Sequence, residues 1–225
     1  MGRGAQYYIG DAWLRVTHPE FSIAGEFTYA GGQVDNASLI PGVVTTKPVK
    51  SAQIGFAIES EIGTVTSPFG AGIDGGYASG DPGATLGAAT FPPNGNRVDS
   101  FRFHPDYHID RILFREIIGQ VTGAFYVRPH ARARIFKVPT GELRAEFATI
   151  ASFASTSDWS PSGERPLGVE VDPSLVYKSR DGFYVALDYG ILFPLAGMDN
   201  PKDNLRAQLA ESIRLRVAFL FGGGQ

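Results

Sequence analysis

The sequence predicts an all-β fold with one antiparallel sheet, and three patterns in its 225 residues support this class. Apolar and polar residues alternate along most of the chain, short and long connections follow one another in turn, and aromatic residues stand near the ends of the alternating segments. Strict alternation is typical of strands whose two faces meet different surroundings. The 28 glycines and the aromatic content of 12 % also suit a chain of strands and turns.

The alternation is clearest at the C-terminal end. From Ile213 to Phe221 every odd-numbered residue is apolar, while Arg214 and Arg216 occupy even positions. Because successive side chains of a strand point to opposite faces, this segment has one apolar face and one mostly polar face. Weaker or equal alternation upstream predicts eight further strands, near 5–17, 21–31, 49–62, 68–79, 125–135, 143–153, 167–177 and 183–193.

The connections between these strands fall into two classes that alternate along the chain. Short turns are expected at 18–20, 63–67, 137–141 and 179–182, and long loops near 32–48, 80–123, 155–166 and 196–206. Outer-membrane barrels have short periplasmic turns and long outer loops. No apolar run reaches the roughly 18 residues that a membrane-spanning helix needs. The pattern therefore predicts an antiparallel transmembrane β-barrel in the bacterial outer membrane, with membrane lipids around it.

Aromatic residues stand at both ends of the predicted strands. They are Phe21, Phe69, Phe136, Tyr177, Phe183 and Phe221 near short turns or the last strand end, and Tyr29, Tyr77, Phe125, Phe153 and Phe193 beside long loops. Two such rows resemble the aromatic girdles that mark the two headgroup regions of a membrane barrel. The alternative is that they are core aromatics of a soluble β-sandwich.

The strand number bears on how much of the barrel is present. About nine strands are visible, whereas single-chain bacterial barrels have even strand numbers. The first residues, from Met1 to Gln6, contain no apolar signal segment, although an outer-membrane protein must be exported. We therefore expect residues 1–225 to form a single barrel segment, N-terminally truncated, of a larger even-numbered barrel.

Composition argues against several other classes of protein. The formal net charge is −3, so the basic face of a nucleic-acid-binding protein is not expected. Cysteine is absent, which excludes disulfides, thiolate metal sites and a cysteine nucleophile. Neither a Gly-x-Ser-x-Gly elbow nor a glycine-rich loop before a convincing helix occurs. We expect no nucleic-acid partner, no cofactor and no enzymatic activity, and the oligomeric state stays open.

The polar faces of the strands supply the candidate functional residues. Alternation places charged side chains on the face opposite the apolar one, where they would line a pore and act on passing ions. The predicted pore-lining residues are Arg128, His130, Arg132, Arg134, Arg144, Glu146, Glu170, Asp172, Asp188, Arg214 and Arg216. Neighbouring pairs, such as Arg144 with Glu142 or Glu146, would also neutralise one another.

The segment 80–123 is far longer than a connection needs. Its part 112–119 reads as a short apolar helix closed by Gly119. The segment would either enter the lumen as a constriction or rest on the barrel rim as an outer cap. The residues proposed for the constriction are Arg102, His104, Asp106, His108, Asp110, Arg111 and Arg115. His104 and His108 have metal-ligand spacing on a helix, but Pro105 between them argues against a helix, and no metal site is expected.

A family resemblance adds to this interpretation. The stretches Gly76 to Asp81, Pro105 to Gly119 and Tyr189 to Pro194 resemble porin-like barrels, namely an uncharacterised myxobacterial-type family and, more distantly, alginate-export-type porins. The resemblance covers roughly residues 70–221. It implies passive diffusion of small hydrophilic solutes through an outer-membrane channel. Two alternatives are a barrel-embedded hydrolase and a soluble β-barrel whose apolar face points inward around an apolar ligand.

Overall fold

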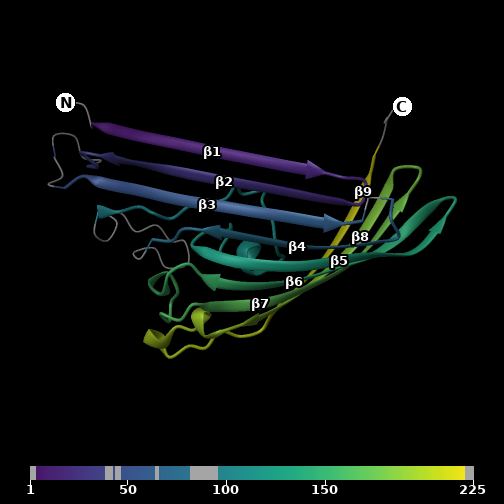
Figure 1. The fold of residues 1–225 in the computed structure, drawn as a ribbon. Helices are drawn as coiled ribbons and strands as arrows, with labels where there is room; N and C mark the ends of the chain where they lie inside the picture. Colours follow the sequence, from purple (N-terminus) through teal and green to yellow (C-terminus); the bar gives the residue numbers. More distant parts are fainter. Residues whose placement is uncertain (1–3, 39–42, 44–46, 64–65, 82–95, 221–225) are drawn as a thin grey trace.

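The protein is all-β. The computed structural model describes residues 4–38, 43, 47–63, 66–81 and 96–220. Within these residues nine strands form one sheet in the order of the sequence, and all neighbours are antiparallel (Figure 1). The strands are β1 (Ala5–Thr17), β2 (Phe21–Val34), β3 (Val49–Ile62), β4 (Phe69–Ala78), β5 (Ala124–Val138), β6 (Gly141–Ala154), β7 (Pro166–Ser179), β8 (Phe183–Pro194) and β9 (Ala210–Phe219).

The connections follow the predicted alternation. The short connections follow β1, β3, β5 and β7, and the longer ones follow β2, β4, β6 and β8. Because neighbouring strands are antiparallel, the two classes begin at opposite ends of the sheet (Figure 1). The helical elements of the described residues are short turns in the long connections: η3 (Leu113–Ile117), η4 (Ser157–Trp159), η5 (Ala196–Met198) and η6 (Pro201–Asp203). Among the described residues, no helix is long and apolar enough to cross a bilayer. Phe221 and residues 82–95 of the predicted long loop lie outside the described residues.

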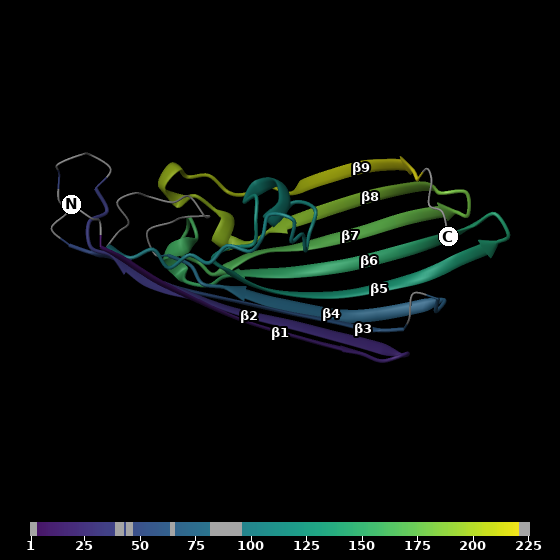
Figure 2. The ribbon, with the colours of Figure 1, turned by 90° about the horizontal axis from the view of Figure 1, so that it is seen from above.

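The sheet is curved and open. β1 and β9 form its two edges, and among the described strands they do not pair with each other. Figure 2 shows the connection that leads into β5, residues 96–123 with η3, over the inner face of the curved sheet rather than beyond its rim. The described part of the segment 80–123 therefore lies against the inner face of the sheet.

The two faces of the sheet differ in the predicted way. On β9, Ile213, Leu215 and Val217 are exposed on the outer face, while Arg214 and Arg216 point to the inner face and contact acidic side chains there. Leu167 is an exception to the rule that odd-numbered residues of these strands lie on the outer face. The pairing of β6 with β7 shifts between Ser152 and Phe153, and Leu167 is fully buried as a result.

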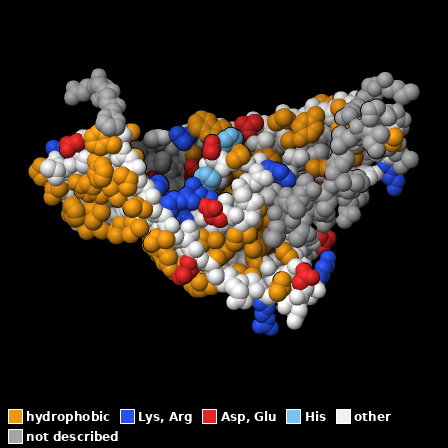
Figure 3. Space-filling view, turned by 180° about the vertical axis from the view of Figure 1, so that it is seen from behind, with side chains coloured by type: hydrophobic (Ala, Val, Ile, Leu, Met, Phe, Trp, Pro, Cys, Tyr) orange, Lys and Arg blue, Asp and Glu red, His pale blue; other side chains and the backbone are white. Residues whose placement is uncertain are grey.

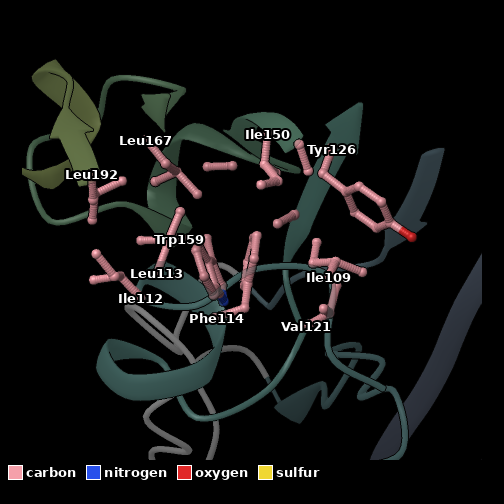
Figure 4. Close-up of a cluster of buried hydrophobic side chains, with 13 residues drawn as sticks. Ile109, Ile112, Leu113, Phe114, Val121, Tyr126, Ile150, Trp159, Leu167 and Leu192 are labelled. Carbon is pink, nitrogen blue, oxygen red and sulfur yellow. The ribbon is translucent and has the colours of Figure 1, made fainter. Parts of the chain in front are cut away.

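The hydrophobic core lies between the inner face of the sheet and the segment 96–123, which precedes β5. Figure 4 shows its members, which come from this segment, from β5 to β8 and from η4. Leu113, Phe114 and Trp159 are among the largest side chains buried there. Fully burying one such side chain contributes about 1.5–3 kcal/mol. Gly123 is required beside Trp159, because its φ is +56° and a Cβ would lie 2.2 Å from the indole ring.

Candidate functional site

A hollow of about 410 Å³ lies on the inner face between β3, β5 to β9 and the segment after residue 96. Figure 3 shows basic, acidic and histidine side chains gathered at a hollowed part of the surface, beside a broad hydrophobic area. Most of the predicted residues line this hollow. From the strands these are Arg128, His130, Arg132, Glu146, Asp172, Asp188, Arg214 and Arg216, and from the segment His108, Asp110, Arg111 and Arg115.

Asp188 is the centre of the charged network on β8 and β9. Its carboxylate is buried, and it accepts from Arg216 at 2.6 Å and from Arg111 at 2.9 Å. The hydroxyl of Ser174 donates to the same carboxylate, and Arg111 also donates to the Ser174 oxygen at 2.8 Å. Two guanidinium groups therefore share one carboxylate, which leaves local positive charge facing the hollow.

Glu116 on η3 binds a second pair of arginines. Its carboxylate lies 2.8 Å from Arg214 of β9 and 3.8 Å from Arg115. Burial lowers the pKa of Arg115, and the charge of Arg214 lowers it further. Two arginines of the segment and two of β9 thus share two carboxylates, those of Asp188 and Glu116.

Two predicted residues lie apart from this hollow. Arg134 and Arg144 both contact Glu142, at 3.5 Å and 2.7 Å, near the turn between β5 and β6. Neither belongs to the lining of the 410 Å³ hollow. Here the alternative of mutual neutralisation describes the contacts better than a role in lining the hollow, and of the two predicted partners of Arg144 the one in contact is Glu142.

Glu170 was predicted to line the pore, but its carboxyl group is buried beneath the segment that covers the inner face. Its two oxygens accept the backbone N–H groups of Arg111, Ile112 and Leu113 at 2.8, 2.8 and 3.0 Å. A charged acceptor that binds several N–H groups makes strong hydrogen bonds. Glu170 therefore anchors η3 to β7.

Asp110 is also buried at this junction. One of its carboxyl oxygens accepts the N–H of Phe114 at 2.8 Å. Burial, followed by the nearby charge of Glu170, raises the pKa of Asp110 to about 7, and the hydrogen bond from Phe114 opposes the rise. The Asp110 carboxyl group thus exchanges its proton near neutral pH.

The remaining constriction residues lie farther out. Arg102, His104 and Asp106 are exposed, and His104 Nδ1 lies 3.6 Å from the Asp106 carboxylate. Arg102 and His104 line a smaller groove of about 160 Å³, beside aromatic residues that include Tyr107. Burial raises the pKa of Tyr107 to about 12. In the described residues, no group of three or more His, Cys, Asp or Glu side chains is placed to hold a metal ion.

A second hollow, of about 350 Å³, lies on the inner face of β1 to β5 and adjoins the first at β3 and β5. Its central acid is Asp74, which is not among the pore-lining residues predicted from the sequence. Asp74 contacts Arg128 at 2.6 Å and His130 at 3.3 Å. Asp74 stands at an even-numbered position of β4, as Gly76 and Ala78 do, and alternate residues of a strand share one face. This alternation was the pattern in the sequence that could have placed Asp74 on the inner face.

The second hollow also tests the hydrolase alternative, because His130 has both a carboxylate and a serine near it. Ser60 lies in the same hollow. However, its hydroxyl donates to the carbonyl of Ile73 at 2.6 Å and accepts the Ile73 N–H at 3.2 Å. These bonds bridge a gap in the β3–β4 ladder. They bind the hydroxyl to the backbone rather than to an activating histidine.

No protein-family model matches the chain, and no curated protein matches its sequence. The resemblance to porin-like barrels therefore stays a prediction based on the sequence stretches quoted above.

Proposed function

We propose that this chain forms part of an outer-membrane β-barrel through which small hydrophilic solutes diffuse passively. The observation that carries the proposal is the opposite polarity of the two faces of one curved sheet. The charged face surrounds the hollows, and the apolar face is turned outward. A soluble barrel around an apolar ligand would need the reverse arrangement.

The outer face supports a lipid environment. On β9, Ile213, Leu215 and Val217 expose 74 %, 65 % and 60 % of their surface. Large exposed hydrophobic side chains also occur on β2, β3 and β5, so the apolar surface extends across the sheet. Soluble monomers rarely expose apolar patches larger than a few hundred Å², and larger ones mark contact with another protein or a membrane. Two-faced strands of this kind are what a membrane barrel requires.

The open edges fit the same proposal. β1 and β9 each have a neighbour on one side only among the described strands. In lipid, unpaired backbone N–H and C=O groups cost several kcal/mol each, so spanning sheets close. We therefore propose that these two edges pair with further strands in the membrane, which would give the larger barrel that the sequence predicts.

The lining charges favour anions weakly. Among the described residues, six arginines and five carboxyl groups line the larger hollow. Of the carboxyl groups, that of Asp110 has a raised pKa of about 7, which reduces its negative charge at neutral pH. Fixed positive charge lowers the entry energy of anions, and salt screens it over about 10 Å at roughly 0.1 M. We therefore expect a mild anion preference at low salt.

Reconstitution in planar bilayers tests the channel and its selectivity. The reversal potential in a salt gradient should show a mild anion preference. Arg132→Gln removes a lining charge that pairs with Glu61 at 2.7 Å, so it should shift the reversal potential toward cations. Arg180→Gln, on an exposed turn away from the larger hollow, is the matched control and should leave it unchanged. Absence of any pore would refute the channel. A pore without the Arg132 shift would refute only the role of that arginine.

A further inference from the structure

Four carboxyl groups are buried where the segment 109–118 meets β7 and β8. Asp110, Glu170, Asp172 and Asp188 each expose no more than 7 % of their surface. Ionised carboxylates are costly to bury unless they are paired and hydrogen-bonded. The state of protonation at this junction therefore decides how firmly the segment is held.

The segment is attached to the sheet through two of these groups. Glu170 accepts three consecutive backbone N–H groups, those of residues 111 to 113. Asp188 accepts from the guanidinium of Arg111 at 2.9 Å. Leu113 and Phe114 then pack into the core beside Trp159 (Figure 4). Backbone, side-chain charge and apolar contacts all fix the same short stretch.

The other two carboxyl groups lack this compensation. One Asp110 oxygen, Oδ1, is buried without a hydrogen-bond partner among the described residues. One Asp172 oxygen, Oδ1, is likewise buried without a partner among the described residues, and an unpaired buried oxygen is more costly on an ionised carboxylate than on a protonated one. The docked junction is therefore built for at least one protonated acid, and Asp110 is the one on the segment itself.

We propose that residues 109–118 form a pH-sensitive plug, which is docked while the Asp110 carboxyl carries a proton and is released when that proton is lost. Some of the charged groups around Asp110 oppose its ionisation, and others favour it. Glu170 and Asp172 of β7 oppose ionisation of Asp110, whereas Arg115 favours it. The outer parts of the network are Asp188 of β8, Arg214 and Arg216 of β9, and Arg111, Glu116 and His108 of the segment.

The direction of the pH effect follows from linkage. The pKa of Asp110 is about 7 in the docked state, above its ordinary value of 3.8. Between these values the docked state holds more protons than the released state, so docking weakens as pH rises through this range. Docking is strongest in acid and weakest above pH 7. The idea that release widens the passage rests on the proposed function, whereas the docking itself does not.

Trp159 provides a test that does not require a working pore. It is fully buried in the core beside the segment, and the only other tryptophan in the chain is Trp13. In a Trp13→Phe background, acrylamide quenching of Trp159 in lipid vesicles should rise at least about twofold between roughly pH 5 and pH 9. Asp110→Asn, which resembles the protonated acid, should keep the low quenching of acidic pH throughout.

Asp106→Asn, at an exposed acid four residues away, is the matched control and should follow the parent protein. Unchanged quenching of the parent across this range, or an Asp110→Asn variant that follows the parent, would overturn the plug. If Asp110→Asn does not fold, hydrogen exchange in the parent decides, since the N–H groups of residues 111 to 113 should exchange faster at high pH than intrinsic base catalysis predicts. A protein that forms no pore but shows the quenching change would refute the channel and leave the plug intact.

Discussion

The inner face of the sheet is covered over β5 to β8 and open over β1. On β7, alternate residues from Glu170 to Val176 are buried, whereas all 13 residues of β1 are exposed. Both strands have mixed polar and apolar sequences, so the difference comes from what packs on them. One half of the sheet has a conventional protein core, and the other half relies on its neighbours in the sheet and, in our proposal, on lipid.

The largest expected difference between the two halves is in the free energy of unfolding that is lost when an apolar side chain is shortened to alanine. Leu113→Ala removes a fully buried side chain from the covered half and should lower the free energy of unfolding by about 2–5 kcal/mol. Ile9→Ala, on exposed β1, should cost about 0.5 kcal/mol or less. Urea unfolding of both variants in lipid vesicles measures the difference. Equal costs would mean that the segment does not form a core with the sheet.

A charge on the outer face should give a slightly smaller effect. Val217→Arg places a guanidinium on the apolar face of β9 and should destabilise the inserted protein by about 2–4 kcal/mol if the site lies near mid-bilayer. Ala218→Arg, its neighbour on the inner face, is exposed and should cost much less. Folding yield in vesicles compares the two, and indistinguishable yields would place both faces of β9 in water.

The sequence predicted much of the fold because strands and turns are set locally. The alternation around Ile213 and the short turns located the strands to within a few residues. It also separated the outer face from the inner one. Arginines such as Arg132 and Arg216 were assigned to the inner face on parity alone, and they line the hollow there.

Burial on the inner face could not be predicted in the same way. The alternation alone predicts that Glu170 faces an open pore, but its carboxyl group is buried. Glu170 is covered by backbone N–H groups 57 to 59 residues away in the sequence. Leu167 is buried because a register shift reverses its side. Such contacts depend on long-range packing, which periodicity does not encode.

The most direct test of the central claim compares the two faces of β9 in membranes. Single cysteines at positions 214, 215, 216 and 217 would be labelled with a water-soluble maleimide in lipid vesicles, because the chain has no native cysteine. We predict that Arg214→Cys and Arg216→Cys react, that Leu215→Cys and Val217→Cys do not, and that all four react equally after unfolding in urea. Equal labelling of the four positions in vesicles would contradict the account.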